Sequence, residues 1–227
     1  MKILKVRSCV AAALVLTVAG TATAQERPAG LLNSVEVRQL AARAEAADNV
    51  RLGVHFTALA DLYAADARRH ITMSESYAGN ARGSIGSGMT AHCKRLADLN
   101  TQAAAAARDL ASYHEKLAGG IAATAPRDGA RFLGGAGAPD PTVQELKTLA
   151  AEANTPAQHR ALEEYFRMLA KRYASDADEH TALAQAYRGT RLSQAAVHHD
   201  RLAALARDEA KEATGAAAMH KSLAGAR

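Results

Sequence analysis

Apolar residues recur every three or four positions through most of the chain from residue 34 to residue 223, and polar residues occupy the positions between them. This spacing is typical of amphipathic α-helices. Short groups of Gly, Pro, Asn and Asp interrupt the pattern, and they mark where helices begin and end. The pattern predicts six helices, over residues 34–47, 50–78, 88–117, 141–153, 156–188 and 191–223.

One motif occurs twice within the long predicted helices, with identical internal spacing. Seven-residue steps return a side chain to the same helix face with a drift of only about 20°. The aspartate of the motif lies one helical turn before its histidine. The same aromatic, acidic and imidazole groups are therefore expected along one face of two helices. The copies are Phe56, Tyr63, Asp66, His70 and Tyr77, and Phe166, Tyr173, Asp176, His180 and Tyr187.

The similarity continues into the next predicted helix, where the residues from His92 to Leu96 correspond to those from His198 to Leu202. We infer an internal duplication of a helical hairpin. The first repeat covers residues 34–118 and the second covers residues 143–224. Residues 119–142 between them are rich in Gly, Ala and Pro and are predicted to be a linker.

The pattern predicts an all-α fold, a four-helix bundle with up-down-up-down order in which a short helix precedes each hairpin. Abundant alanine and an aromatic content of only 4% favour helix over sheet. In that order both hairpin turns lie at one end, and His114 and His220 are expected together near the other end. Four histidines on the expected inward faces of the long helices are predicted to lie at one level of the bundle: His70, His92, His180 and His198.

Histidines that point inward from facing helices predict a metal site inside the bundle. Imidazole and carboxylate ligands suit transition metals, and the general affinity order favours copper or zinc. The expected function is non-enzymatic metal binding, with no catalytic or cofactor-binding residue. The candidate ligands are His70, His92, His180, His198, Asp66 and Asp176.

A second interpretation is that the histidines belong to a buried polar layer, hydrogen-bonded to the tyrosines and aspartates of the motif. Such a layer fixes the register of a bundle made mostly of Ala and Leu, and the protein would then be a structural or envelope-interaction module. A haem held by two histidines is disfavoured, because the chain has no C-x-x-C-H motif for covalent attachment. The role of Cys93 stays open.

The first 24 residues predict a secretory signal peptide, because a basic start, a short apolar run and an A-x-A site ending at Ala24 follow one another. We therefore expect a secreted or periplasmic protein. No later stretch is apolar enough to span a bilayer. Without the leader, which contains Lys2, Lys5 and Arg7, the basic surplus falls from five to two. Basic residues alternate with acidic ones, so a nucleic-acid partner is not predicted.

The Tyr-Ala-x-Asp-Ala-x-x-His core and the segment from Met89 to Leu96 resemble those of small, uncharacterised exported bacterial helical proteins with a duplicated Tyr/Asp/His hairpin. The likeness covers most of the chain after the leader. The resemblance implies an exported, all-helical protein, and it implies no particular activity.

Overall fold

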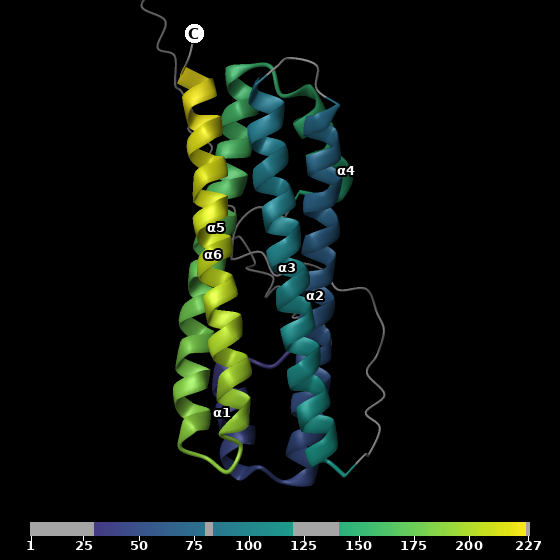
Figure 1. Cartoon of the computed structure of the whole chain (residues 1–227), viewed down its shortest axis with the longest axis vertical. Helices are drawn as coiled ribbons and strands as arrows, with labels where there is room; N and C mark the ends of the chain where they lie inside the picture. The colour runs from purple at the N-terminus through teal and green to yellow at the C-terminus, as the bar shows by residue number, and fades with distance from the viewer. Residues whose placement is uncertain (1–29, 80–83, 120–140, 226–227) are drawn as a thin grey trace, which may run out of the picture.

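The computed structural model describes residues 30–79, 84–119 and 141–225, and these residues form six α-helices and no β-strand (Figure 1). The all-α prediction is confirmed for this part of the chain. The predicted signal peptide and most of the predicted linker lie outside the described residues. The helices are α1 (Ser34–Arg43), α2 (Ala46–Ala78), α3 (Ser84–Leu117), α4 (Val143–Glu152), α5 (Pro156–Arg188) and α6 (Gln194–Gly225).

The helix starts follow from local capping. α5 begins where the sequence predicts, with Thr155 as the N-cap and Pro156 in the first helical position. α1 also begins at the predicted residue, and its N-cap is Asn33. The Asn33 side chain accepts a hydrogen bond from the backbone N–H of Glu36, and the Glu36 carboxylate accepts one from the backbone N–H of Asn33. This capping box satisfies two backbone donors that the first turn leaves unpaired.

The bend between α1 and α2 differs from the prediction. α1 ends before Ala44, which has the left-handed φ of 54°, and α2 begins at Ala46, earlier than the predicted residue 50. Asp48 lies in the first turn of α2, and its carboxylate accepts hydrogen bonds of 2.7 and 3.1 Å from the guanidinium of Arg43. This ion pair closes the bend from one helix to the next.

The four long helices pack side by side as a helical bundle (Figure 1). In that view α2 rises, α3 and α5 descend and α6 rises, so the two hairpin connections lie at opposite ends. Hydrogen bonds from Tyr63 to His180 and from His70 to Tyr173 agree with this, because the numbers rise along α2 and fall along α5. The predicted up-down-up-down order is therefore wrong. A linker as long as residues 120–140 lets the second hairpin enter from either end.

The seam between α2 and α5 is wider than the other helix–helix interfaces. Within the described ranges, no α-carbon of α2 lies within 8 Å of one in α5, whereas α2–α3, α3–α6 and α5–α6 all pack closely. The short helices α1 and α4 each contact both α2 and α5, at opposite ends of the bundle (Figure 1). Small side chains permit the close interfaces, and the buried alanines of α3 and α6 include Ala103, Ala104, Ala106, Ala107, Ala203, Ala206, Ala213 and Ala216.

Two apolar clusters form the core. One includes Phe56 together with Val37 and Leu40 of α1, and the other includes Phe166 together with Leu146 of α4. Each short helix therefore completes the core at its own end of the bundle. None of the helices in the described ranges is long and apolar enough to cross a membrane.

Substitution of two glycines within the helices tests the close packing of this fold. A Cβ atom at Gly53 would lie 3.3 Å from the Cγ of exposed Glu115, whereas one at Gly215 would lie 2.9 Å from the Cε1 of His92. We expect Gly53→Ala to stabilise the protein by about 0.5–1 kcal/mol through helix propensity. Gly215→Ala is expected to give no such gain, because the His92 ring has to move away from Glu212. Urea unfolding measures both.

The control is Gly215→Ala in a His92→Ala background, where the full helix-propensity gain is expected to return. Equal stabilisation by Gly215→Ala in both backgrounds would contradict the contact between Gly215 and the imidazole of His92.

Candidate functional site

Three of the six predicted ligands lie in the core as expected. Asp66, His70 and His180 are at most 5% exposed. Asp176 lies at the edge of the same polar layer and is partly exposed. The motif on α2 and α5 therefore does line the inside of the bundle.

His92 and His198 do not point into the core, so this part of the prediction is wrong. Both are partly exposed, and the next residues along the chain, Cys93 and His199, are completely buried. The Nδ1 atom of His92 instead lies 2.9 Å from a carboxylate oxygen of Glu212 on α6. One residue of helical rotation, about 100°, separates His92 from the buried Cys93 and His198 from the buried His199.

The same prediction placed two buried polar residues outside the core. Asn100 on α3 and Glu209 on α6 are both completely buried. A hydrophobic pattern assigns such residues to the surface, although the apolar members of the predicted faces, such as Leu96 and Leu202, are buried as expected. The packing of α3 and α6 against two helices each decides the true inward face.

The seam histidines do not share one level. Tyr63 Oη lies 3.2 Å from His180 Nε2, and Tyr173 Oη lies 3.5 Å from His70 Nε2. Each histidine is thus opposite a tyrosine of the facing helix and not opposite the other histidine. Since seven residues separate Tyr63 from His70, the two histidines are about 10 Å apart along the bundle.

His114 and His220 lie at opposite ends, which also contradicts the prediction. His114 Nε2 is 3.3 Å from the hydroxyl of Tyr187, near the end of α5, whereas His220 Nε2 is 3.0 Å from the hydroxyl of Tyr77, near the end of α2. These two contacts repeat the pairing of tyrosine with histidine seen in the middle of the bundle. The antiparallel course of α2 and α5 places them far apart.

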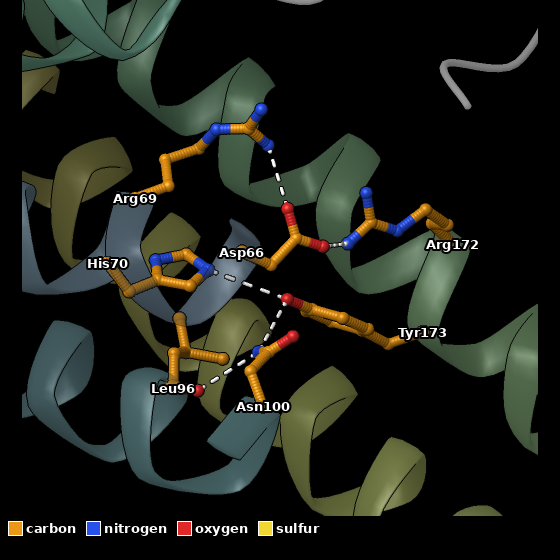
Figure 2. Close-up of polar contacts among 7 residues, drawn as sticks. All are labelled: Asp66, Arg69, His70, Leu96, Asn100, Arg172 and Tyr173. Atoms are coloured by element: carbon orange, nitrogen blue, oxygen red, sulfur yellow. Dashed lines mark hydrogen bonds and ion pairs between the residues drawn. The ribbon is translucent and has the colours of Figure 1, made fainter. Parts of the chain in front are cut away.

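The middle of the seam contains a shared carboxylate (Figure 2). Asp66 accepts hydrogen bonds from Arg172 at 2.7 Å and from Arg69 at 2.9 Å. The Arg172 guanidinium also lies 4.8 Å from the ring centroid of Tyr173, a cation–π distance. Burial, followed by the charges of Arg172 and Arg69, lowers the pKa of His70 to about 3. The same positive charges disfavour a metal cation at His70, so Asp66 and His70 fit a structural role.

Two further carboxyl groups in this layer ionise less readily than a carboxyl group in water. Burial raises the pKa of Asp176 to about 6, against the opposing effect of Arg172. Burial likewise raises the pKa of Glu209 well above its usual value. Neither carboxyl oxygen of Glu209 has a hydrogen-bond partner within the described part of the chain. A protonated, neutral Glu209 is the form that this environment favours.

Two pairs of imidazoles face each other between α5 and α6. The Nδ1 atoms of His180 and His199 are 3.2 Å apart, and those of His159 and His220 are also 3.2 Å apart. The sequence interpretation missed His159 and His199. A signal for both exists, because the two members of each pair are equally far from the turn between α5 and α6.

Burial keeps these imidazoles uncharged. It lowers the pKa of His180 to about 4, with a smaller contribution from His55, and it lowers the pKa of His199 well below the usual value. Burial, followed by the neighbouring His159, lowers the pKa of His220 to about 3. Neutral imidazole is the form that binds transition metals.

The described residues contain no convergent group of three or more His, Cys, Asp or Glu side chains that could hold a metal ion. The predicted six-residue ligand set is therefore not assembled, and the imidazole pairs are the closest approach to one. No family model, curated protein or solved structure matches the chain. The fold defines the class of the protein, a helical bundle with a buried histidine–tyrosine layer.

The buried histidines predict a steep loss of stability in acid. Because their pKa values in the folded protein are below the usual 6.5, unfolding takes up protons, and stability falls as pH decreases from about 6.5 towards 4. A pKa lowered to about 4 in the folded protein, as for His180 and His114, reduces the free energy of unfolding at pH 4 by about 3 kcal/mol per histidine. Circular dichroism during an acid titration is expected to show cooperative unfolding in this range, whereas full helicity at pH 3.5 would contradict it.

The raised pKa of Glu209 predicts the opposite dependence of stability on pH. A raised pKa in the folded protein contributes stability below about 4.5, and that contribution is lost as pH rises towards the folded value. Glu209→Gln is therefore expected to raise the free energy of unfolding at pH 8 and to change it little at pH 4.5. Urea unfolding at both pH values tests this, with Glu212→Gln, at a partly exposed position of the same helix, as the control. An equal effect of Glu209→Gln at both pH values would contradict the assignment.

Proposed function

We propose that the protein binds a transition-metal ion, copper or zinc, through buried histidines and without catalysing a reaction. The observation that carries the proposal is the pair of facing Nδ1 atoms of His180 and His199, 3.2 Å apart in the core. This pair takes the place of the six-residue set that the sequence predicts. Of that set, only His180 remains a ligand.

The separation of the two nitrogen atoms suits a shared ion. Imidazole nitrogens bind zinc at about 2.0–2.1 Å, and two such bonds to atoms 3.2 Å apart enclose an angle of about 100°. That angle is close to tetrahedral. The ion would lie where the two nitrogens now share a proton, His199 would carry that proton on Nε2, and solvent or a small ligand would complete the coordination.

The surroundings favour the tautomer that metal binding needs. The Tyr63 hydroxyl oxygen lies 3.2 Å from His180 Nε2, where it can accept a hydrogen bond from a protonated Nε2. His180 then keeps the lone pair of Nδ1 for the ion, as outer hydrogen-bond partners do in metal sites generally. The ring of Phe56 lies 5.5 Å from that of His199 and shields this side from water.

A second candidate function is a structural or envelope-interaction module, in which the same groups serve only register and packing. The observation in its favour is that buried tyrosines and histidines pair across the bundle at four levels. The pairs are Tyr63 with His180, Tyr173 with His70, Tyr77 with His220, and Tyr187 with His114. Buried hydrogen-bonded layers of this kind specify one helix alignment.

We also propose that the protein acts outside the cytoplasm. The support is the signal-peptide pattern of residues 1–24, a basic start, an apolar run and a small-residue site. Copper and zinc binding is compatible with that location, because imidazole ligands do not depend on a reduced thiol. The internal duplication of the hairpin is part of the same proposal.

Metal titration of the untagged, metal-free protein tests the proposed function. Zn²⁺ and Cu²⁺ are added separately in isothermal titration calorimetry, and thermal unfolding is followed in parallel. We expect binding to raise stability by about 2.7 kcal/mol at a free ion concentration of 100 Kd. His199→Asn is expected to weaken binding at this pair at least tenfold. Asparagine can still hydrogen-bond to an imidazole, as Asn49 does to His114.

His92→Ala and His198→Ala are the matched controls, because both histidines are partly exposed and outside the pair. They are expected to leave the affinity unchanged. A wild-type protein that binds neither ion, together with Tyr63→Phe and His199→Asn variants that are merely less stable, would refute metal binding and favour the structural module.

A further inference from the structure

A second pair of imidazoles lies near the other end of the α5–α6 hairpin. His159 Nδ1 and His220 Nδ1 are 3.2 Å apart, and the two rings are inclined by 32°. The corresponding values for His180 and His199 are 3.2 Å and 34°. The two pairs therefore have nearly the same geometry.

The surroundings of the second pair are similar to those of the first, although the tyrosine of α2 contacts the α6 histidine here and the α5 histidine there. His220 is completely buried and His159 is 6% exposed. The hydroxyl of Tyr77 lies 3.0 Å from His220 Nε2, and in the first pair the hydroxyl of Tyr63 lies 3.2 Å from His180 Nε2. The ring of Phe166 stacks on that of His220 at a centroid distance of 5.8 Å.

The first hairpin lacks both pairs. By the spacing of the repeated motif, Asn49 occupies the position of His159, and Cys93 occupies the position of His199. His114 Nδ1 accordingly lies 2.8 Å from the side-chain oxygen of Asn49, with no second imidazole. Cys93 is buried, and burial raises the pKa of its thiol to about 12, so it stays protonated. A protonated thiol is a poor metal ligand.

Resting on the proposed function, we infer that the protein holds a second transition-metal ion between His159 and His220. The α5–α6 hairpin supplies all four imidazole ligands, and α2 supplies the tyrosines that orient one imidazole of each pair. The two copies of the motif thus differ in function: the second supplies metal ligands, and the first supplies the tyrosines that orient them. Since 21 residues of α5 separate His159 from His180, the ions lie about 30 Å apart and bind independently.

Ion counting with exchanged residues tests this inference. The protein is saturated with Zn²⁺, freed of excess ion by gel filtration and measured by elemental analysis. We expect two ions per chain in the wild type and one in His159→Asn. The asparagine can pair with His220 as Asn49 pairs with His114, so the fold is expected to survive. Helicity by circular dichroism checks this.

The reciprocal variant, Asn49→His, places a second imidazole beside His114 and is expected to raise the count to three. A count that stays at two would overturn the conclusion that a facing imidazole pair is sufficient to hold an ion here. His92→Ala, outside both pairs, is expected to retain two ions.

The outcomes separate the second site from the proposed function. One ion in the wild type that His199→Asn removes and His159→Asn retains would overturn the second site and leave metal binding at His180 and His199 in place. No ion in any variant would overturn both. Loss of one ion in each of the two variants, and of both ions in the double variant, would establish two independent sites.

Discussion

The wide seam between α2 and α5 is the constraint on which the rest of this structure depends. Long polar side chains cross it, and the motif histidine of each helix lies next to a tyrosine of the other, as His180 lies next to Tyr63. A motif with tyrosines seven residues before and after a histidine allows this pairing only when one helix is displaced by a heptad. With the histidines at one level, imidazole would face imidazole and phenol would face phenol. Antiparallel α2 and α5 provide the complementary arrangement, and α1 and α4 complete the core at the two ends.

A second general property of the structure is that burial keeps several ionisable side chains of the interior uncharged. Burial favours neutral imidazoles at His180, His199 and His220 and a neutral carboxyl at Glu209. Charge remains in the middle of the seam, where Asp66 is shared by two arginines (Figure 2). That positive surplus makes the middle unfavourable for a cation, whereas burial and neighbouring histidines, not arginines, lower the pKa values of His180 and His199. The electrostatics therefore separate a structural centre from two candidate binding positions.

Much of the fold could be predicted from the sequence, and much less of the site. The number of helices, the hairpins and the start of α5 at Pro156 follow from periodicity and capping, which are local effects. The burial of His70 and His180 follows from the same periodicity. His92 and His198 were predicted to point inward but lie at the edge of the buried faces of α3 and α6, and the same prediction placed the buried Asn100 and Glu209 outside the core. No local signal reveals a polar residue that tertiary packing buries.

By itself the sequence determined the number of helices, the start of α5 and the sets of residues that share a face on α2 and α5, because these depend on neighbours within one or two turns. Only the tertiary structure decided which end of the bundle the second hairpin enters, since a long linker permits either direction. That choice decides which tyrosine of the other hairpin lies next to His70, His114, His180 and His220. It separates His70 from His180 and His114 from His220. The inward faces of α3 and α6, set by packing against two helices each, then bring His199 to His180 and His220 to His159.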